Sequence, residues 1–398
     1  MSYQFDGHMD TGNLSRKKWE YEIERTGFQD LLSFGTADMD YHSPKPVLDA
    51  IRGVADAGHL GYPHIRDSYY QTIEQWLERL ASWKINGKES VTPHVGIYMA
   101  CITAMDAFSE PGDEVIIQTP VHARFTQLVK DNGRVPVSNP LKVVDGRYEM
   151  DYEQLERCIT EKTKILWICN PHNPVGRAWT AAELQRLGDI CLSHGVYILS
   201  DDIYYGMVYS GVSYTPIASL SKELSQISIT CYSPSKCYNT TGVNQSFTII
   251  ENPQMQEKYK KSLHKTDLDY AINIVGLAIT EETCSGSCDG WLKDFMVYVK
   301  KNHEYLTEFV KEQMPGASVA EADSTYFGWI DMRNLHLPSE KIADAFLNEG
   351  HILVNDGAVL GTGGEGYIRM NLACPRDTLE MGLWRMAKVY RDLCAGEV

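Results

Sequence analysis

The segment Ser233-Pro234-Ser235-Lys236-Cys237-Tyr238-Asn239-Thr240-Thr241-Gly242 comes directly after an apolar run, Ile227-Ser228-Ile229-Thr230-Cys231-Tyr232. The run predicts a short buried strand, so Lys236 is expected in the loop that follows a strand. A lysine between small hydroxylated residues at such a place suits covalent chemistry, because its amine can condense with an aldehyde. Ser233, three residues earlier, can donate a hydrogen bond to a phosphate. The same spacing also occurs in exposed loops, where the lysine has no chemical role. Other residues of the chain are therefore needed to decide whether Lys236 is a covalent attachment point or an ordinary loop lysine.

Strand and helix patterns alternate on both sides of this segment. Apolar runs predict strands at 114–118, 135–138, 165–170, 196–200, 227–232 and 245–250, and helices are expected at 98–108, 125–132 and 180–194. The alternation predicts a mostly parallel sheet with right-handed crossovers and with both faces covered. Two further helices are expected earlier in the chain, from Ser43-Pro44 to about residue 57 and from 67 to 83.

The pattern changes after about residue 285. A long helix is expected from 290 to about 310, with shorter strands at 326–332, 351–354 and 367–372 and helices at 339–349 and 377–393. We therefore predict an α/β protein in three parts. These are an N-terminal arm (1–45) that packs on the small domain, a large three-layer domain (46–285) and a small α+β C-terminal domain (286–398).

Composition restricts the partners of the protein. Its 398 residues are 43% apolar and carry a formal net charge of −16, which argues against nucleic acid or an anionic membrane as a partner. The N-terminus shows no export signal, and no run approaches the ~20 apolar residues that span a bilayer. We expect a cytoplasmic protein with ten reduced cysteines. Cys284 and Cys288, without further ligands nearby, do not predict a metal site.

Three predicted strands end in residues that can do chemistry. Strand 165–170 leads into Asn173, strand 196–200 leads into Asp201 and Tyr204, and strand 227–232 leads into Lys236. Ligands of open α/β sheets bind beyond the carboxyl ends of the strands. An amide, a carboxylate and an amine therefore converge on one crevice, although each of them alone could be an ordinary helix cap or turn residue.

Pyridoxal 5'-phosphate (PLP) accounts for this set of residues, because it carries an aldehyde, a pyridine nitrogen and a phosphate. Asp201 is placed to stabilise the protonated pyridine ring, with Asn173 and Tyr204 to bind the 3'-oxygen. The residues Gly96, Ile97 and Tyr98 open a predicted helix, whose free N–H groups can bind a phosphate.

Over nearly its whole length the chain resembles the fold-type-I PLP enzymes, and among them the cystathionine β-lyase/C–S lyase branch of the class I/II aminotransferase family. The motifs that carry the resemblance are ADMDY (37–41), GYPHIRDSYY (61–70), PGDEVIIQTP (111–120), CNPHNPVGRAWT (169–180), SPSK (233–236), NDG (355–357) and YIRMNLACPR (367–376). The resemblance implies a PLP-binding large domain and a homodimer with shared active sites.

The same resemblance assigns roles to individual residues. It implies that Lys236 is the Schiff-base lysine and the catalytic base, and that Arg369 binds the α-carboxylate of an amino-acid substrate. Tyr62 is expected to reach the cofactor phosphate of the neighbouring subunit. Asp38 and Met39, in the first motif, are expected at the substrate.

Some positions depart from the pattern of the branch. Tyr204 replaces the usual histidine and is typical of aminotransferases, and His122 stands where an aromatic residue normally stacks on the cofactor ring. Asn244 stands where many aminotransferases have a phosphate-binding arginine, and Val95–Met99 replaces the usual Pro-Gly-Val-Val-Pro loop. Arg124 is expected either to bind a distal carboxylate of the substrate or to lie on the outer face of the following helix.

Three functions follow as hypotheses. The first is a C–S β-lyase that cleaves cystathionine or a related cysteine S-conjugate to a thiol, pyruvate and ammonia. The second is an aminotransferase acting on an amino acid and a 2-keto acid, which Tyr204 favours. The third is a PLP-binding regulatory protein, against which the complete set of Lys236, Asp201, Asn173 and Arg369 argues.

Overall fold

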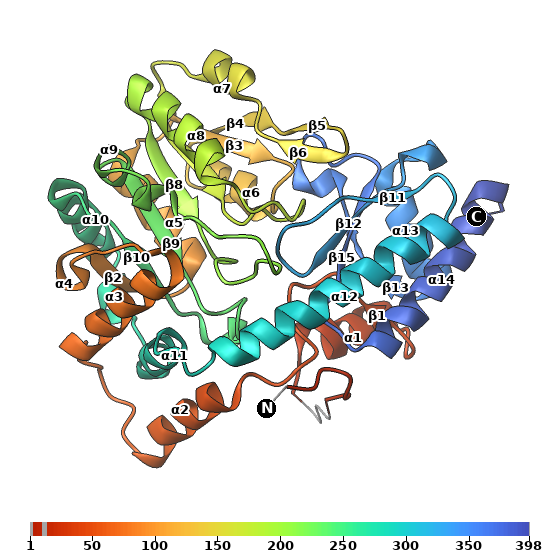
Figure 1. Cartoon of the computed structure of the whole chain (residues 1–398), viewed down its shortest axis with the longest axis horizontal. Coiled ribbons are helices and arrows are strands. Elements are labelled where there is room, and N and C mark those ends of the chain that lie inside the picture. The colour runs from red at the N-terminus through yellow and green to blue at the C-terminus, as the bar shows by residue number, and fades with distance from the viewer. Residues whose placement is uncertain (1–2, 10–13, 398) are drawn as a thin grey trace.

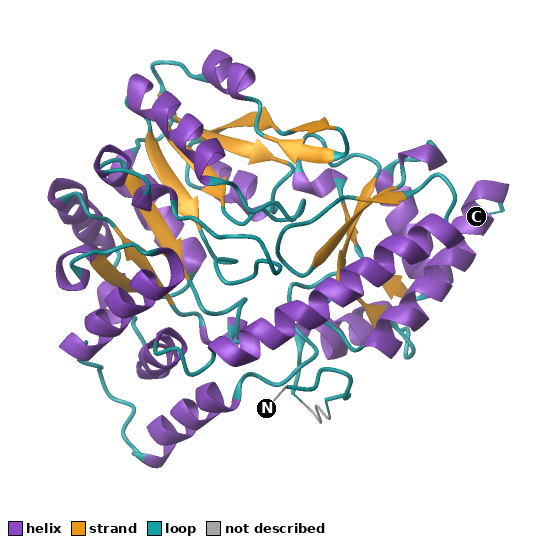
Figure 2. Ribbon diagram, in the orientation of Figure 1, coloured by secondary structure: helices purple, strands orange, loops and turns teal. Residues whose placement is uncertain are grey.

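The computed structural model describes residues 3–9 and 14–397. A long helix, α12 (Asp289–Gln313), runs from the side of the molecule that holds the larger sheet to the side that holds the smaller one (Figures 1 and 2). The larger sheet has seven strands, in the order β2 (Val91–His94), β10 (Ser246–Ile249), β9 (Ser228–Tyr232), β8 (Tyr197–Asp201), β7 (Thr163–Cys169), β3 (Glu114–Thr119) and β4 (Val135–Pro140).

The larger sheet is parallel except at one side. The strands β4, β3, β7, β8 and β9 run parallel, whereas β10 is antiparallel to both β9 and β2. The strand β2 was not expected from the sequence, because Val91-Thr92-Pro93-His94 is short and contains a proline. Its pairing with β10, more than 150 residues away in the chain, makes it a strand.

Helices cover both faces of this sheet, as its apolar strands require. In β7, Ile165, Trp167 and Cys169 belong to one core, and Leu166 and Ile168 to the other. The first face packs against helices that include α3 (Asp67–Ala81), α5 (Ile97–Phe108), α6 (Arg124–Asp131) and α11 (Ile274–Cys284), and the second against α7 (Tyr152–Cys158) and α8 (Ala181–His194). The sheet therefore forms the middle of three layers.

The smaller sheet is antiparallel and has a core of its own. Its strands lie in the order β11 (Ser318–Val319), β12 (Phe327–Asp331), β15 (Tyr367–Asn371) and β14 (Asn355–Asp356). It packs against α12, α13 (Ser339–Gly350) and α14 (Arg376–Ala395) through residues such as Ile330, Ile368 and Leu383. A short hairpin, β5 (Lys142–Val144) and β6 (Arg147–Glu149), follows β4 in the chain and lies on the side of the molecule that holds the larger sheet.

The N-terminal region is more ordered than its polar sequence suggests. A helical turn at Lys17–Tyr21 continues into α1 (Glu22–Thr26), and β1 (Leu32–Ser33) pairs with β13 (Ile352–Leu353). Phe5 packs edge-on against Tyr41 and two aromatic rings of α12. The arm predicted over 1–45 also includes residues 1–2 and 10–13, which lie outside the described part of the chain. The division into three parts stays a prediction.

Most helix ends lie within two residues of the expected positions. The helix predicted from Ser43-Pro44 is α2 (Lys45–Asp56), and α8 begins with a capping box between Thr180 and Glu183. The helices α10 (Pro253–Lys265) and α11 were not predicted. For α11 the reason is that apolar residues surround much of it instead of marking one face. No helix in the described ranges is both long and apolar enough to cross a membrane.

Candidate active site

The carboxyl ends of three neighbouring strands meet at one edge of the larger sheet. Cys169 of β7, Asp201 of β8 and Cys231 of β9 lie side by side in register. The loops that follow therefore bring Asn173, Asp201, Tyr204 and Lys236 to the lining of one small cavity of about 40 Å³, together with Ala37, Tyr98 and His122. This is the crevice that the strand ends predicted.

Lys236 is half-buried, and its amine faces a backbone carbonyl. Its Nζ donates to the oxygen of Ala37 at 2.8 Å. Burial lowers the pKa of Lys236 to about 8, and the charge of Arg369 acts in the same direction against the opposing effects of Asp38 and Asp201. A lysine with such a pKa is neutral often enough near pH 8 to act as a nucleophile or base.

The two consecutive carboxylates Asp201 and Asp202 point to opposite sides of β8. Asp201 lines the small cavity and accepts a hydrogen bond from the Ile203 backbone at 3.2 Å. Asp202 accepts instead from the hydroxyls of Ser200 and Tyr214. Burial raises the pKa of Asp201 to about 7 and that of Asp202 to about 8. Only Asp201 is therefore placed to face a ligand in this cavity.

Arg369 on β15 lies at the far side of the same site. It is 3% exposed, and its Nη atoms donate to Asn173 Oδ1 at 3.1 Å, to the Gly35 carbonyl at 3.0 Å and to Asn355 Oδ1 at 2.5 Å. The guanidinium stacks over Phe327 at 4.3 Å, and burial lowers its pKa. Its Nε is buried without a hydrogen-bond partner among the described residues, so it has a donor available for an anion.

Asn173 connects this arginine to Tyr204. The Nδ2 of Asn173 lies 3.5 Å from the Tyr204 hydroxyl, at the limit of a hydrogen bond. Both side chains are buried, so each has few alternative partners. Their polar atoms converge between Asp201 and Arg369, where a ring oxygen of a ligand could bind.

A second cavity of about 480 Å³ continues from the first and shares Ile97, Tyr98, Ile203 and Lys236 with it. Its wall includes the N-terminus of α5, where Gly96 has a φ of +90° that other residues rarely adopt. Ser233 and Ser235 also face it, and the hydroxyl of Ser233 donates to the Gln245 carbonyl at 2.6 Å. Free N–H groups of a helix end beside hydroxyls are suited to a phosphate.

The remaining candidates lie at three different places. The hydroxyl of Tyr98 lies 3.2 Å from His122 Nδ1, and burial lowers the pKa of His122 to about 3, so its imidazole is neutral. Arg124 lines the larger cavity. Tyr62 lies in neither cavity and is 90% exposed, so a single chain does not bring it to the site.

The segment 35–41 covers the site in a way that the sequence did not predict. Asn239 donates to the Met39 and Tyr41 carbonyls, and Asn371 donates to the Thr36 and Asp38 carbonyls. The contact of Lys236 with Ala37 belongs to the same arrangement, which places Asp38 and Met39 next to the crevice. Backbone carbonyls leave no signal in a sequence, although the motif ADMDY marked the segment itself.

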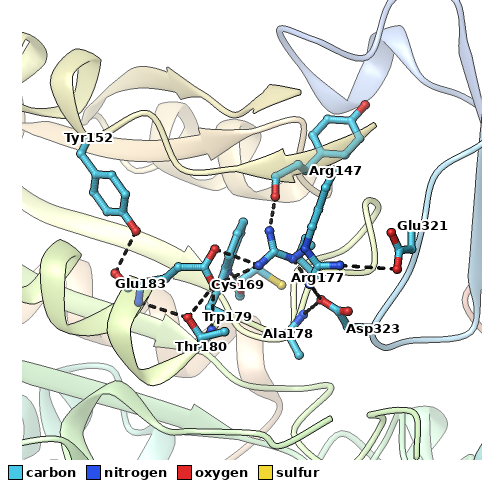
Figure 3. Close-up of polar contacts among 11 residues, drawn as sticks. Arg147, Tyr152, Cys169, Arg177, Ala178, Trp179, Thr180, Glu183, Glu321 and Asp323 are labelled. Atoms are coloured by element: carbon cyan, nitrogen blue, oxygen red, sulfur yellow. Dashed lines mark hydrogen bonds and ion pairs between the residues drawn. The ribbon is translucent and has the colours of Figure 1, made fainter. Parts of the chain in front are cut away.

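An ion-pair network centred on the buried Arg177, four residues after Asn173 in the chain, was also missed (Figure 3). Arg177 bonds Asp323 at 3.0 Å through Nε and Glu183 at 2.8 Å through Nη2, and Arg147 bonds Asp323 at 2.7 Å. Figure 3 shows Arg177 between the start of α8 and the segment that leads to β12. The network thereby ties the loop that carries Asn173 to the side of the smaller sheet that carries Arg369.

These residues fit pyridoxal 5'-phosphate group by group. A lysine with a lowered pKa is available for the aldehyde, a buried carboxyl for the pyridine nitrogen, and the amides and hydroxyls of the larger cavity for the phosphate. The unpartnered Nε of Arg369 remains for the carboxylate of an amino acid. Within the described residues no group of histidines, cysteines and carboxylates could hold a metal ion.

Comparison with known proteins gives a consistent result. Residues 29–385 match the family described as aminotransferase class I and II. The chain is 34% identical over 384 residues to cystathionine beta-lyase PatB of Bacillus subtilis, covering 96% of this chain and 98% of that protein. The structure of cystalysin from Treponema denticola, which contains pyridoxal 5'-phosphate, superposes with a TM-score of 0.94 at 29% identity over 99% of this chain and 100% of the other.

A PLP-bound C–S lyase from Staphylococcus hominis superposes with a TM-score of 0.90 at 26% identity over 98% of each chain. These likenesses confirm the predicted three-layer α/β fold with its smaller second sheet.

Proposed function

Because the chain belongs to the class I and II aminotransferase family, we propose that it is a PLP-dependent C–S β-lyase. It cleaves cystathionine or a related cysteine S-conjugate to a thiol, pyruvate and ammonia. One observation carries the proposal: a lysine and a buried carboxyl line one crevice, and an arginine with an unpartnered donor contacts Asn173, which lines the crevice too. The names of the relatives, cystathionine beta-lyase and C–S lyase, support this reaction over the others of the family.

Arg369 binds and orients the substrate. Its buried guanidinium, held by Asn173, Gly35 and Asn355, offers Nε to the α-carboxylate as a charge-assisted donor. Since these contacts fix the plane of the guanidinium, the Cα–H bond of the substrate is held in one orientation. Asp38 and Met39 follow Ala37, which lines the small cavity, and they would contact the substrate and limit the access of water.

Lys236 moves the proton. Its pKa of about 8 allows Nζ to be neutral, so that it would hold the cofactor through its aldehyde and would take the proton from the substrate Cα. The Cβ–S bond then breaks, the thiolate leaves with the electron pair, and hydrolysis of the released aminoacrylate gives pyruvate and ammonia. When bound, PLP supplies an electron sink for the negative charge at Cα.

The remaining residues hold the cofactor in place. Asp201 would stabilise the protonated pyridine nitrogen, Asn173 and Tyr204 would bind the 3'-oxygen, and His122, whose imidazole is neutral, would line the space of the ring. The N-terminus of α5, with Gly96, Ile97 and Tyr98, and the hydroxyl of Ser233 bind the phosphate.

We also propose that the active unit is a cytoplasmic homodimer. Tyr62, Leu60 and Tyr270 are large side chains that are 90%, 73% and 64% exposed, and Tyr62 and Tyr270 border one hollow of about 520 Å³. Exposed apolar groups gathered in this way are typical of an interface. Tyr62 would then contact the cofactor phosphate of the partner. The ten cysteines are all free, as expected in a reducing cytoplasm.

An aminotransferase is the second candidate, because Tyr204 and the family itself allow it. The two reactions share the binding of substrate and the proton transfer to Lys236. They differ in whether the thiolate leaves or the substrate nitrogen stays on the cofactor.

The test is the product formed without any added keto acid. Purified protein with PLP is incubated with cystathionine and other cysteine S-conjugates, and thiol and pyruvate are measured. Equal amounts of both over many turnovers support the lyase. Turnover that requires a 2-keto acid would support the aminotransferase instead. A lack of turnover with a broad panel of amino acids would exclude both enzymes and leave the PLP-binding regulatory protein as the remaining hypothesis.

A further inference from the structure

The larger cavity of the site needs a positive charge. Apart from its two cationic side chains, the polar groups that line this cavity are neutral: backbone amides at the start of α5, the hydroxyls of Ser233 and Ser235, and the amide of Asn244. A phosphate monoester carries roughly −1.5 to −2 charges at neutral pH. The protein itself has a formal net charge of −16, so its overall field repels such a group.

Two cationic side chains line this cavity, Lys236 and Arg124. Lys236 is committed to the aldehyde of the cofactor, so its amine is not available to the phosphate. Arg124 carries a guanidinium, a group that is charged under all conditions that proteins tolerate. It is therefore the one lining residue that can supply a permanent positive charge.

The position of Arg124 has no evident structural purpose. It is the first residue of α6, where the positive end of the helix dipole disfavours a cation. Its side chain is exposed, and it forms no ion pair with any residue that the structure describes. Its guanidinium carbon instead lies 5.8 Å from the ring centre of Tyr98, a residue that borders both cavities.

We propose that Arg124 binds the phosphate group of the cofactor, so that the phosphate is held between the N-termini of α5 and α6. The inference rests on the proposed function in that it takes PLP as the ligand. It competes with the role at a distal carboxylate of the substrate that the sequence suggested, because one guanidinium cannot fully serve both anions.

The experiment compares the dissociation constants of PLP and of pyridoxal, which lacks the phosphate, for the cofactor-free protein. The variants are Arg124→Met, Arg124→Lys and, as a matched control, Lys130→Met, which removes an exposed cation from the same helix. We expect Arg124→Met to raise the Kd of PLP about 10-fold or more and to leave that of pyridoxal unchanged. Arg124→Lys should restore much of the affinity, and Lys130→Met should change neither constant.

Other outcomes overturn the inference. An unchanged Kd of PLP in Arg124→Met excludes the contact, and if only the KM of substrates with a distal carboxylate rises, Arg124 binds the substrate. An equal loss of affinity for PLP and pyridoxal means that Arg124 acts through its packing on Tyr98. Should the unmodified protein fail to bind PLP at all, the proposed function fails together with the inference.

Discussion

Among the single residues, Lys236 has the most demanding role, because one amine must serve both as attachment point and as base. Lys236→Ala removes both, so turnover should fall by at least ~100-fold. Lys222→Ala, which removes an exposed lysine 14 residues earlier, should leave turnover unchanged. Borohydride reduction of the unmodified protein followed by mass spectrometry should place the cofactor on Lys236. A label on another lysine would contradict the mechanism.

The adjacent carboxylates Asp201 and Asp202 form a matched pair for a second prediction. Only Asp201 lines the small cavity, whereas Asp202 is enclosed by Ser200 and Tyr214 on the other side of β8. Asp201→Ala should therefore lower kcat roughly 100-fold or more, because the ring nitrogen loses its counter-charge. Asp202→Ala should leave the visible absorbance of the bound cofactor, and hence its protonation, unchanged. The opposite ranking of the two variants would reverse the assignment.

The third prediction concerns stability and pH. Burial raises the pKa of Asp202 from 3.8 to about 8, so between these values the unfolded chain has released a proton that the folded protein retains. This carboxyl therefore makes the folded state less stable as the pH rises through that window. We expect Asp202→Asn to make the free energy of unfolding of the cofactor-free protein fall less steeply between about pH 5 and about pH 8.

Part of the pH dependence should remain in this variant, because the pKa of Asp201 is also raised, to about 7. Urea unfolding of both proteins at the two pH values measures the difference. Identical slopes would mean that Asp202 is ionised in the folded state.

At the scale of elements, the segment 35–41 links the two sheets and is anchored from the N-terminal helical turn. Lys18, which is 1% exposed, pairs with Asp40 at 2.8 Å and donates to the Asp38 carbonyl at 3.2 Å. Lys18→Met leaves a buried carboxylate unpaired and should cost about 3 to 5 kcal/mol of stability. The double variant Lys18→Met/Asp40→Asn should be less destabilised than the sum of the single changes.

The exposed pair Lys261–Glu257 on α10 serves as the control. Lys261→Met should cost no more than about 1 kcal/mol, because solvent screens this pair. Chemical unfolding of all four variants measures the difference. Comparable losses for Lys18→Met and Lys261→Met would show that the first pair does not anchor the segment.

At the scale of the whole molecule, the proposed dimer makes each site dependent on two chains. A subunit with Lys236→Ala still offers its Tyr62 to a partner, and a subunit with Tyr62→Ala still has its own Lys236. Mixing the two defective proteins under conditions that exchange subunits should therefore restore about a quarter of the activity at limiting PLP. Recovery of no activity, with hybrid dimers shown to be present, would place Tyr62 outside the partner's site.

The order of strands and helices could be predicted because it depends on local patterns. Strands such as β7 and β8 are nearly continuous apolar runs, and both faces of the sheet bury them. Asn173, Asp201 and Lys236 could be grouped for a geometric reason, since parallel strands bring their carboxyl ends to one edge. The motifs around these residues supplied the family, which the comparison with known proteins confirmed.

The contacts that complete the site could not be predicted, because they join segments that are distant in the chain. Lys236 meets the Ala37 carbonyl across 199 residues, and Arg369 meets the Gly35 carbonyl across 334. Every residue type has a backbone carbonyl, so the sequence does not indicate which carbonyl will accept such a contact. The segment β2 is likewise a strand only because it pairs with β10. Local periodicity specifies which face of an element is buried, but only the packed chain specifies what that face meets.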